Sequence, residues 1–500
     1  MAKRRVKVLD TTLRDGEQMP GVALSPEEKL EIAKALDGLG VDIIEAGAAI
    51  TSEGEREAIK RIASEGLKAE ICSFVRGIKG DIDAALKCDV DSVHLVVPTS
   101  DLHLKYKLKK TRAQLKRIAV ETTRYALKHG LVVELSAEDA TRSDPNFLKE
   151  VFQAGVEEGA QRVCVCDTVG VKTPEQIEKL FSDVTKVLKV PVAAHCHDDF
   201  GVATANTLAA VRGGAGEVHV TVNGLGERAG NAALEEVALG LSQFYKIKTG
   251  IKLKKLYEVS RLVERCTDLP VPPMKSVVGV NAFSHEAGIH THGVLAHPST
   301  YEPISPEVVG QRRRLVFGKH VGSHAVMSEL KRLGLKPTKK QVRDVFDRVK
   351  KLGDRGKLVT DAEWSAIVDE VMGRSLEKLV KLDELTVTSG NRITPTASVR
   401  LKFRDKELVE SGIGIGPVDA AMNAIRKVVE GVSSIRLREY HVDAISGGSD
   451  AMVSVVVKVT DGKRVVTARG SSGDIIMASV QAMLNGVNRL LWDKELGRGE

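Results

Sequence analysis

The chain has 500 residues, too long for one hydrophobic core, and this length predicts about three domains. Apolar residues make up 42%, charged residues 28% and aromatic residues 4%, and this balance with a net charge of only +7 excludes disordered chains, collagens and nucleic-acid binders. No apolar run is long enough to span a membrane, so no membrane partner is expected. The six cysteines form no CxxC pair, which is typical of a protein of the reducing cytoplasm.

Short β-branched runs alternate with helix-like segments over the first half of the chain. Strands that alternate with helices predict parallel pairing through right-handed crossovers. Eight such units favour a closed (β/α)8 TIM barrel; a doubly wound open sheet is the alternative, but it usually has fewer strands. The predicted strands are Val6–Asp10, Val41–Glu45, Ala69–Phe74, Ser92–Val97, Leu131–Ser136, Arg162–Cys166, Val190–His195 and Glu217–Val222.

The remaining half changes character twice. Helices and loops are predicted first, with a histidine-rich loop over Gly279–His297 and a helix over Thr360–Val371. Strands then return, and two helices repeat one apolar pattern, which predicts a duplicated strand–strand–helix unit; two unrelated amphipathic helices are the alternative. We expect an α/β protein with a barrel at residues 1–250, a helical subdomain at 251–380 and an α+β domain at 381–500. The strands predicted in the last part are Thr396–Phe403, Ile435–Ala444, Met452–Thr460 and Arg464–Arg469.

Polar side chains collect at the predicted C-terminal ends of the barrel strands, where active sites of this fold lie. His195 and His197 end the seventh strand and, being two residues apart, face the same side. Asp15 follows the first strand, and a glycine-rich loop ending at Asn231 follows the eighth, its neighbour in a closed barrel. Two imidazoles, a carboxylate and an amide oxygen suit Mg2+, Mn2+, Zn2+ or Co2+. Buried histidines bonded to the backbone are the alternative.

Several short sequence motifs, among them the His195/His197 pair, occur together in one known enzyme family. Together they resemble the isopropylmalate/homocitrate/citramalate synthase family over nearly the whole chain, most closely its prokaryotic (R)-citramalate synthase branch. The resemblance implies an enzyme that condenses acetyl-CoA with a 2-oxo acid on a metal-bearing barrel. The other runs are Thr11–Gln18, Glu45–Glu55, Cys72–Arg76, Gly224–Asn231 and His285–His290.

The resemblance also implies roles for individual residues. Asp15, His195 and His197 would hold the divalent metal ion, with Asn231 as an additional ligand. The ion would chelate the 2-oxo acid and polarise its ketone. Arg14 would stabilise the charge that develops on the ketone oxygen; a structural ion pair is the alternative.

Further catalytic roles fall on three residues outside the metal site. Glu138, His290 and Tyr301 would act in removing a proton from the acetyl group, and the sequence leaves open which of them takes it. Thr168 would donate a hydrogen bond to the substrate carboxylate, with a helix cap as the alternative.

The choice of 2-oxo acid depends on the strand ends around Ile71, His94 and Ser136. Overall likeness favours pyruvate and therefore (R)-citramalate, a precursor in isoleucine biosynthesis. Ser136 is small and leaves room for 2-oxoisovalerate, so 2-isopropylmalate synthesis is the first alternative. Arg76 keeps homocitrate synthesis open, because it could bind a distal carboxylate.

The remaining predictions concern partners. Arg312–Arg314 and Gly318–His320 could bind the phosphates of acetyl-CoA, or could lie on a solvated face. The terminal domain resembles the family's allosteric domain, which implies a branched-chain amino-acid effector and a homodimer. An acyl-CoA lyase would usually lack that domain, and an amino-acid sensor would not need the Asp15 and histidine set.

Overall fold

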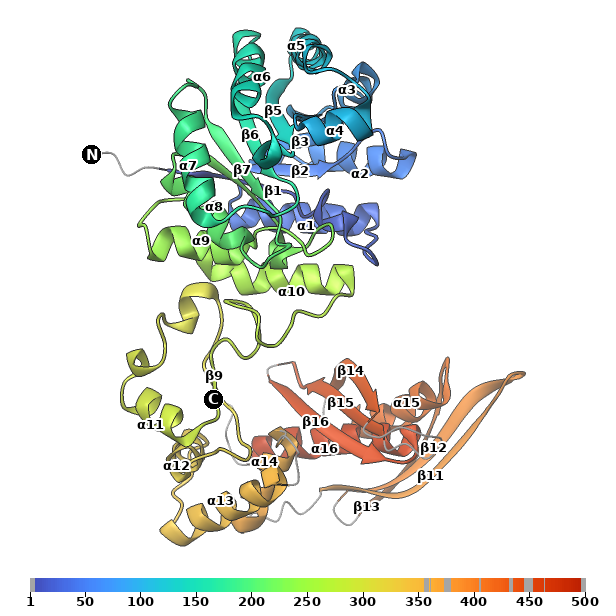
Figure 1. Cartoon of the computed structure of the whole chain (residues 1–500). Helices are drawn as coiled ribbons and strands as arrows, with labels where there is room; N and C mark the ends of the chain where they lie inside the picture. Colours follow the sequence, from blue (N-terminus) through green and yellow to red (C-terminus); the bar gives the residue numbers. More distant parts are fainter. Residues whose placement is uncertain are drawn as a thin grey trace. The chain divides into compact units, whose positions relative to one another are not determined.

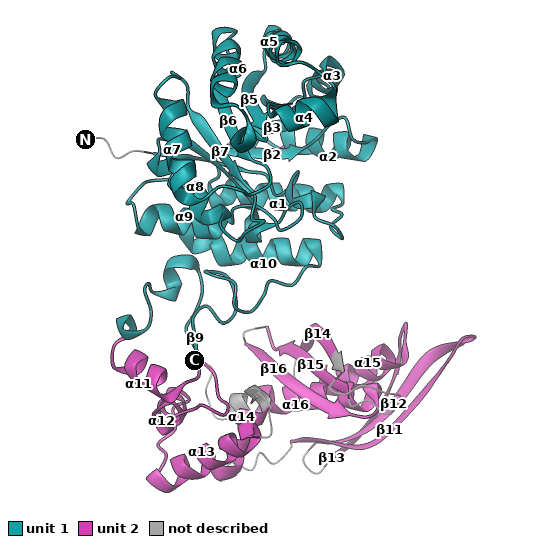
Figure 2. Cartoon of the chain, in the orientation of Figure 1, with its two compact units in different colours: residues 1–285, 298–314 teal, residues 286–297, 315–500 magenta. Residues whose placement is uncertain are grey.

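The computed structural model describes residues 5–354, 359, 361–372, 379–403, 406–430, 435–444, 453–462 and 464–495. Thr360 and Met452, two predicted element ends, lie outside these residues. The chain forms two compact units, Met1–His285 with Pro298–Arg314 and Glu286–His297 with Leu315–Glu500 (Figure 2). The three-part division at residues 250 and 380 stays a prediction.

Eight parallel strands close into a barrel in which every strand pairs with its neighbours in chain order (Figure 1). The register Lys7↔Glu217 to Asp10↔Val220 joins the first strand to the eighth and completes the ring. The predicted TIM barrel is therefore confirmed, and the open sheet is excluded. The strands are β1 Lys7–Asp10, β2 Ile43–Gly47, β3 Glu70–Arg76, β4 Ser92–Pro98, β5 Val132–Glu138, β6 Arg162–Asp167, β7 Val192–Cys196 and β8 Glu217–Val220.

The helices around the barrel begin where the sequence supplies caps. Ser25 accepts a hydrogen bond from the backbone N–H of Glu28, whose side chain accepts from the N–H of Ser25, and Pro26 occupies the first helical position. The α-helices of this unit are α1 Pro26–Leu39, α2 Glu53–Ala63, α3 Lys79–Leu86, α4 Asp101–His103, α5 Arg112–Lys128, α6 Pro145–Glu157, α7 Pro174–Thr185, α8 Ala203–Arg212, α9 Leu234–Gln243 and α10 Leu256–Thr267. The shorter turns are η1 Gly16–Gln18, η2 Leu104–Leu108, η3 Ala140–Arg142, η4 Val222–Gly224, η5 Leu253–Lys255, η6 Pro298–Thr300 and η7 Pro306–Val309, with short strands β9 Ser284–His285 and β10 Arg314–Leu315.

Each barrel strand turns one set of side chains toward the helices and the other into the barrel. Outward residues such as Ile44 and Leu95 join the helices in one large apolar core. The inward set is unusually polar for this fold, whose interiors are mostly filled by branched aliphatic residues. Its buried charged and polar members are Glu45, His94, Glu134, Arg162, Glu217 and His219.

The second unit contains a helical part and two antiparallel sheets. Phe317 and Trp364 stack at 3.9 Å within the apolar core of the helical part. Its helices are α11 Gly288–Ala296, α12 Ser323–Arg332, α13 Lys339–Asp354 and α14 Asp361–Val371. Among the described residues, no helix of the chain is both long and apolar enough to cross a membrane.

The two sheets form the predicted duplication, with three strands per repeat where the predicted unit had two. The sequence indicated all three strands of the second repeat but only the middle strand of the first. Each repeat has three antiparallel strands followed by a helix. The strands β11 and β13 were missed because most of their side chains are exposed and polar, so no clear apolar alternation marks them. The repeats are β11 Val380–Gly390, β12 Ile393–Phe403, β13 Lys406–Ile413 and α15 Pro417–Glu430, then β14 Arg436–Ala444, β15 Val453–Thr460, β16 Val465–Ser472 and α16 Ile475–Glu495.

Candidate active site

Asp15, His195 and His197 converge at the C-terminal ends of β1 and β7, and we call these three buried residues the Asp15 cluster. The Nε2 atoms of the two imidazoles lie 3.2 Å apart, and they lie 3.6 and 3.9 Å from Oδ2 of Asp15. Donors about 2.1 Å from a shared metal ion lie roughly 3–4 Å from one another, so the spacing fits a divalent ion. The described residues thus include a possible metal site.

The protonation states of the cluster also fit a cation. Burial would raise the pKa of Asp15, but Arg14 and the two imidazoles outweigh it and hold this pKa well below its usual range. Burial lowers the pKa of His195 and of His197 below the ordinary value. The cluster is therefore one carboxylate and two neutral imidazoles near neutral pH, which are the forms that bind metal ions.

The glycine-rich loop after β8 closes on Asp15. Nδ2 of Asn231 donates to Oδ1 of Asp15 at 2.9 Å, and the backbone N–H of Glu227 donates to the same oxygen at 3.3 Å. Gly226 has a φ of +153°, and a Cβ there would lie 2.1 Å from Nδ2 of Asn231. Only glycine lets the loop approach so closely. The predicted meeting of this loop with Asp15 is thus seen, with the amide nitrogen of Asn231 facing the carboxylate.

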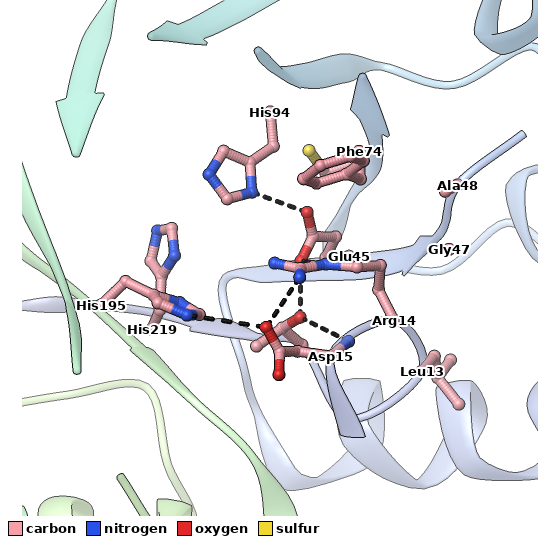
Figure 3. Close-up of polar contacts among 12 residues, drawn as sticks. Leu13, Arg14, Asp15, Glu45, Gly47, Ala48, Phe74, His94, His195 and His219 are labelled. Carbon is pink, nitrogen blue, oxygen red and sulfur yellow. Dashed lines mark hydrogen bonds and ion pairs between the residues drawn. The ribbon is translucent and has the colours of Figure 1, made fainter. Parts of the chain in front are cut away.

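Arg14 is fixed on both sides by carboxylates (Figure 3). Its Nη1 donates to Asp15 at 2.7 Å and its Nε donates to Glu45 at 2.8 Å. Phe74 covers the guanidinium, with its ring centroid 4.8 Å from Cζ. The other oxygen of Glu45 lies 2.6 Å from Nδ1 of His94, so one carboxylate orients both Arg14 and His94.

Sequence reasoning assigned no functional role to Glu45, because it used this position only as the end of a strand and as the start of the family-like run Glu45–Glu55. Glu45 is fully buried. Burial would raise its pKa, but Arg14 and His94 hold this pKa well below its usual range. A carboxylate inside an otherwise apolar strand was the available signal, since buried charges are retained only with partners.

A second polar group fills the barrel beneath His94. Oε1 of Glu134 lies 3.0 Å from Nε2 of His219 and 3.7 Å from Nε2 of His94, while Nε of Arg162 donates to its other oxygen at 3.2 Å. Burial opposes the charge of His219, but Glu134 and Glu217 outweigh it and raise its pKa to about 10. Because Glu134 is already neutralised by two cations, this group is a set of buried ion pairs that supports His94.

One cavity of about 600 Å³ opens over the Asp15 cluster. Glu138, at the end of β5, accepts hydrogen bonds from Nζ of Lys107 at 2.6 and 2.8 Å. Oγ1 of Thr168 accepts from the backbone N–H of Asp139 at 2.8 Å, which leaves its own O–H to donate. The predicted site residues among those that line the cavity are Arg14, Asp15, His94, Glu138, Thr168, His195 and His197.

Other predicted residues are not among those that line this cavity. Ser136 is buried below it, with Oγ 3.4 Å from Glu134. Ile71 faces the helix layer, because the inward residues of β3 are Cys72 and Phe74. Tyr301 is exposed in the first unit, and His290 lies on α11 in the second.

Comparison with known proteins identifies the family. The HMGL-like model matches residues 5–263, the homocitrate synthase post-HMGL domain-like model matches residues 277–357, and the LeuA allosteric (dimerisation) domain model matches residues 358–491. The (R)-citramalate synthase of Methanocaldococcus jannaschii is 58% identical over 97% of this chain and 99% of its own. The chain belongs to the isopropylmalate/homocitrate/citramalate synthase family.

Two further comparisons place this synthase among its relatives. The 2-isopropylmalate synthase of the same organism is 51% identical over 98% of this chain and 96% of its own. The crystal structure of hydroxymethylglutaryl-CoA lyase from Pseudomonas aeruginosa, at 22% identity and a TM-score of 0.50, covers 54% of this chain and 96% of that protein and shares the barrel fold. Family membership makes the chain an enzyme of acyl transfer, as predicted, and excludes a non-catalytic sensor.

Proposed function

We propose that the protein condenses acetyl-CoA with pyruvate to give (R)-citramalate and CoA, a reaction of isoleucine biosynthesis. The observation that carries this proposal is the 58% identity with (R)-citramalate synthase, against 51% with 2-isopropylmalate synthase of the same organism. Both relatives match nearly the whole chain. The difference in identity therefore reflects sequence divergence rather than a missing domain.

The Asp15 cluster would hold Mn2+, Mg2+, Zn2+ or Co2+, with Asn231 as a further ligand if its amide oxygen turns inward. When bound, the ion would polarise the ketone of the 2-oxo acid. Arg14 would donate to the oxygen on which charge develops. Its Nη2 has no hydrogen bond to any described residue, since Nε and Nη1 serve Glu45 and Asp15, and this supports the assignment.

Substrate orientation would come from His94 and Thr168. The free O–H of Thr168 would donate to the substrate carboxylate, which is supported by its acceptance of the Asp139 N–H. His94 is oriented by Glu45 and lines the cavity, so its ring would bound the space for the substrate's end. Ser136 lies below the cavity, and its small side chain would leave room there for the end of the substrate.

The bond-forming step needs a base for the acetyl methyl group. One proton leaves that methyl group, its carbon bonds to the ketone carbon, and the ketone oxygen takes up a proton. Water then cleaves the thioester, giving the second carboxylate and the thiol of CoA. We assign proton removal to Glu138 acting with His290 and Tyr301; cavity position supports Glu138, and the family-like run His285–His290 supports His290.

A substrate panel tests the proposal. Purified protein with Mn2+ and acetyl-CoA should release thiol with the highest kcat/KM on pyruvate, measured with a thiol reagent. A higher value on 2-oxoisovalerate would make it a 2-isopropylmalate synthase, the alternative that the small Ser136 favours. 2-Oxoglutarate should be poor, because Arg76 is already held by Asp81 at 2.7 and 3.0 Å.

The match of residues 358–491 to the LeuA allosteric (dimerisation) domain supports a homodimer with an amino-acid effector. If citramalate is the product, isoleucine is the expected inhibitor; leucine would accompany 2-isopropylmalate. Light scattering and inhibition curves with both amino acids test this part. A cytoplasmic location remains our prediction.

A further inference from the structure

Lys29 of α1 is a charged side chain at a position where the helix pattern calls for an apolar one. It lies three residues before Ile32 and four before Ala33, on the stripe of α1 that faces the core, and it is only 1% exposed. Lysine is almost never buried so completely unless its charge is paired. Lys29 is not among the residues that line the cavity, so its partners indicate what it does.

The three donors of the Lys29 ammonium all have partners. Nζ lies 2.6 Å from Oε2 of Glu17 and 2.6 Å from Oε2 of Glu55, and it donates to the backbone carbonyl of Leu13 at 3.2 Å. An ammonium has three donors and no acceptor, so these contacts use its full capacity. We call Lys29, Glu17 and Glu55 the Lys29 clamp.

The clamp holds the loop after β1 on both sides of its two reactive residues. Leu13 precedes Arg14 directly (Figure 3), and Glu17 follows Asp15 by two residues. The other oxygen of Glu17 accepts from the backbone N–H of Leu24 at 3.0 Å, which ties the far end of the same loop to the clamp. The loop is thus anchored to α1 immediately beside Arg14 and Asp15.

The clamp also reaches the loop after β2, where Gly47 and Ala48 follow Glu45 (Figure 3). Oε1 of Glu55 accepts from the backbone N–H of Ala48 at 3.1 Å. Gly47 has a φ of +148°, and a Cβ there would lie 1.9 Å from the same oxygen, so only glycine lets Glu55 come so close. Glu45 in turn accepts from Nε of Arg14. One ammonium therefore connects the two loops that carry the Arg14–Glu45 ion pair.

Stability alone does not account for a lysine at this position. Replacing a buried ion pair with well-packed apolar residues is often neutral or stabilising, because the cost of desolvation offsets the attraction between the charges. An aliphatic residue at position 29 would simply continue the apolar stripe of α1. A fully satisfied buried polar network instead fixes geometry, because its members find all their partners in one arrangement.

We propose that Lys29 is a positioning residue, which holds the loops after β1 and β2 so that Arg14 and Asp15 keep the placement that metal binding and the condensation require. This inference rests on the proposed function, which places the metal ion on the Asp15 cluster and assigns charge stabilisation to Arg14. A displacement of about 1 Å at a catalytic group lowers the rate about 100-fold. The clamp therefore acts on the reaction through Arg14 and Asp15.

The test separates the position of the loops from the burial of charge. In full-length Lys29→Met/Glu17→Gln/Glu55→Gln, no charge of the clamp is left unpaired, and the amide oxygens still accept from the N–H groups of Leu24 and Ala48. Urea unfolding should therefore stay near wild type. Electron paramagnetic resonance titration of the metal-stripped protein should give a Kd for Mn2+ at least about tenfold higher, and kcat should fall about 100-fold. The KM for acetyl-CoA should stay within about twofold of wild type, because no residue of the clamp lines the cavity.

Lys34→Met is the matched control. Lys34 lies on the same helix and pairs with Glu65 at 2.7 Å, but its side chain is 49% exposed and the pair involves neither loop. The same substitution there should keep the wild-type Kd, kcat and KM. Lys29→Met alone leaves Glu17 and Glu55 without their counter-ion, so it should be less stable than the triple variant.

The outcomes separate this inference from the proposed function. A wild-type Kd for Mn2+ in the triple variant would overturn the positioning role, and so would a triple variant that does not fold, since the clamp would then serve folding alone. Wild-type protein that binds Mn2+ more tightly than the triple variant but releases no thiol with any 2-oxo acid would overturn the proposed function and keep the clamp. Wild-type protein that binds no Mn2+ would overturn both.

Discussion

Replacing Glu45 with Gln removes the charge on which the reactive groups depend. In the wild type, one oxygen accepts from Nε of Arg14 at 2.8 Å and from Oγ1 of Thr11 at 2.5 Å, while the other lies 2.6 Å from Nδ1 of His94. With its oxygen toward Arg14 and Thr11, the amide of Gln turns its nitrogen toward Nδ1 of His94, and this contact persists only when Nδ1 carries no proton. In either orientation of the amide, the negative charge opposite Arg14 is lost.

The expected cost follows from burial. Removing one partner of a buried ion pair typically costs about 3–5 kcal/mol, because the remaining charge is left without a counter-ion. Asp15 still faces Arg14, so we expect the lower end, about 3 kcal/mol of unfolding free energy. A loss of similar size in transition-state stabilisation corresponds to a roughly 100-fold lower kcat/KM.

Urea unfolding measures the free energy of unfolding, and thiol release measures kcat/KM. Elemental analysis counts the bound metal. Metal content should stay at the wild-type level, since the Asp15 cluster is unchanged. Glu235→Gln is the matched control: burial raises the pKa of Glu235 to about 7, so an amide replaces a carboxyl that is already half neutral. Wild-type stability and wild-type kcat/KM in Glu45→Gln would refute the reasoning.

Two further predictions concern the cluster and the core. His195→Ala should lose bound metal and turnover together, because it removes one of two imidazole ligands; elemental analysis and thiol release check this, and wild-type values would contradict the site. Asp10→Asn should stabilise the protein at pH 8 by up to about 4 kcal/mol, with no gain near pH 4. Burial raises the pKa of Asp10 from 3.8 to about 7, so its stabilising neutral form is complete at low pH and lost as the pH rises through 7. Urea unfolding at both pH values measures the difference, which must depend on pH if burial is the cause.

The barrel could be predicted because its signals are local. Alternating strands and helices, caps such as Ser25 with Pro26, and the two-residue spacing of His195 and His197 each act over a few residues. Closure of the ring then brings Asp15 beside the histidines without further information. These parts of the fold and of the candidate site follow directly from sequence periodicity.

The other parts of the fold and of the candidate site depend on the register between strands and on contacts between residues far apart in the sequence. Ile71 and Phe74 both lie on β3, and only the pairing of Phe74 with His94 on β4 shows which one faces the cavity. Lys107 and Glu138 form an ion pair, but no motif or residue spacing in the sequence connects the two segments that carry them. The exposed strands β11 and β13 lack an apolar pattern, so their existence follows only from pairing with β12.

The ion pairs beneath His94 also restrict how this enzyme can be altered. Glu134, Arg162 and His219 are buried and neutralise one another, so a single replacement among them leaves an unpaired charge inside the barrel. Mutant libraries designed to accept new 2-oxo acids should therefore keep Glu134, Arg162 and His219 unchanged. Mutational tolerance should be greatest at the mouth of the barrel, where solvent can compensate for an unpaired group.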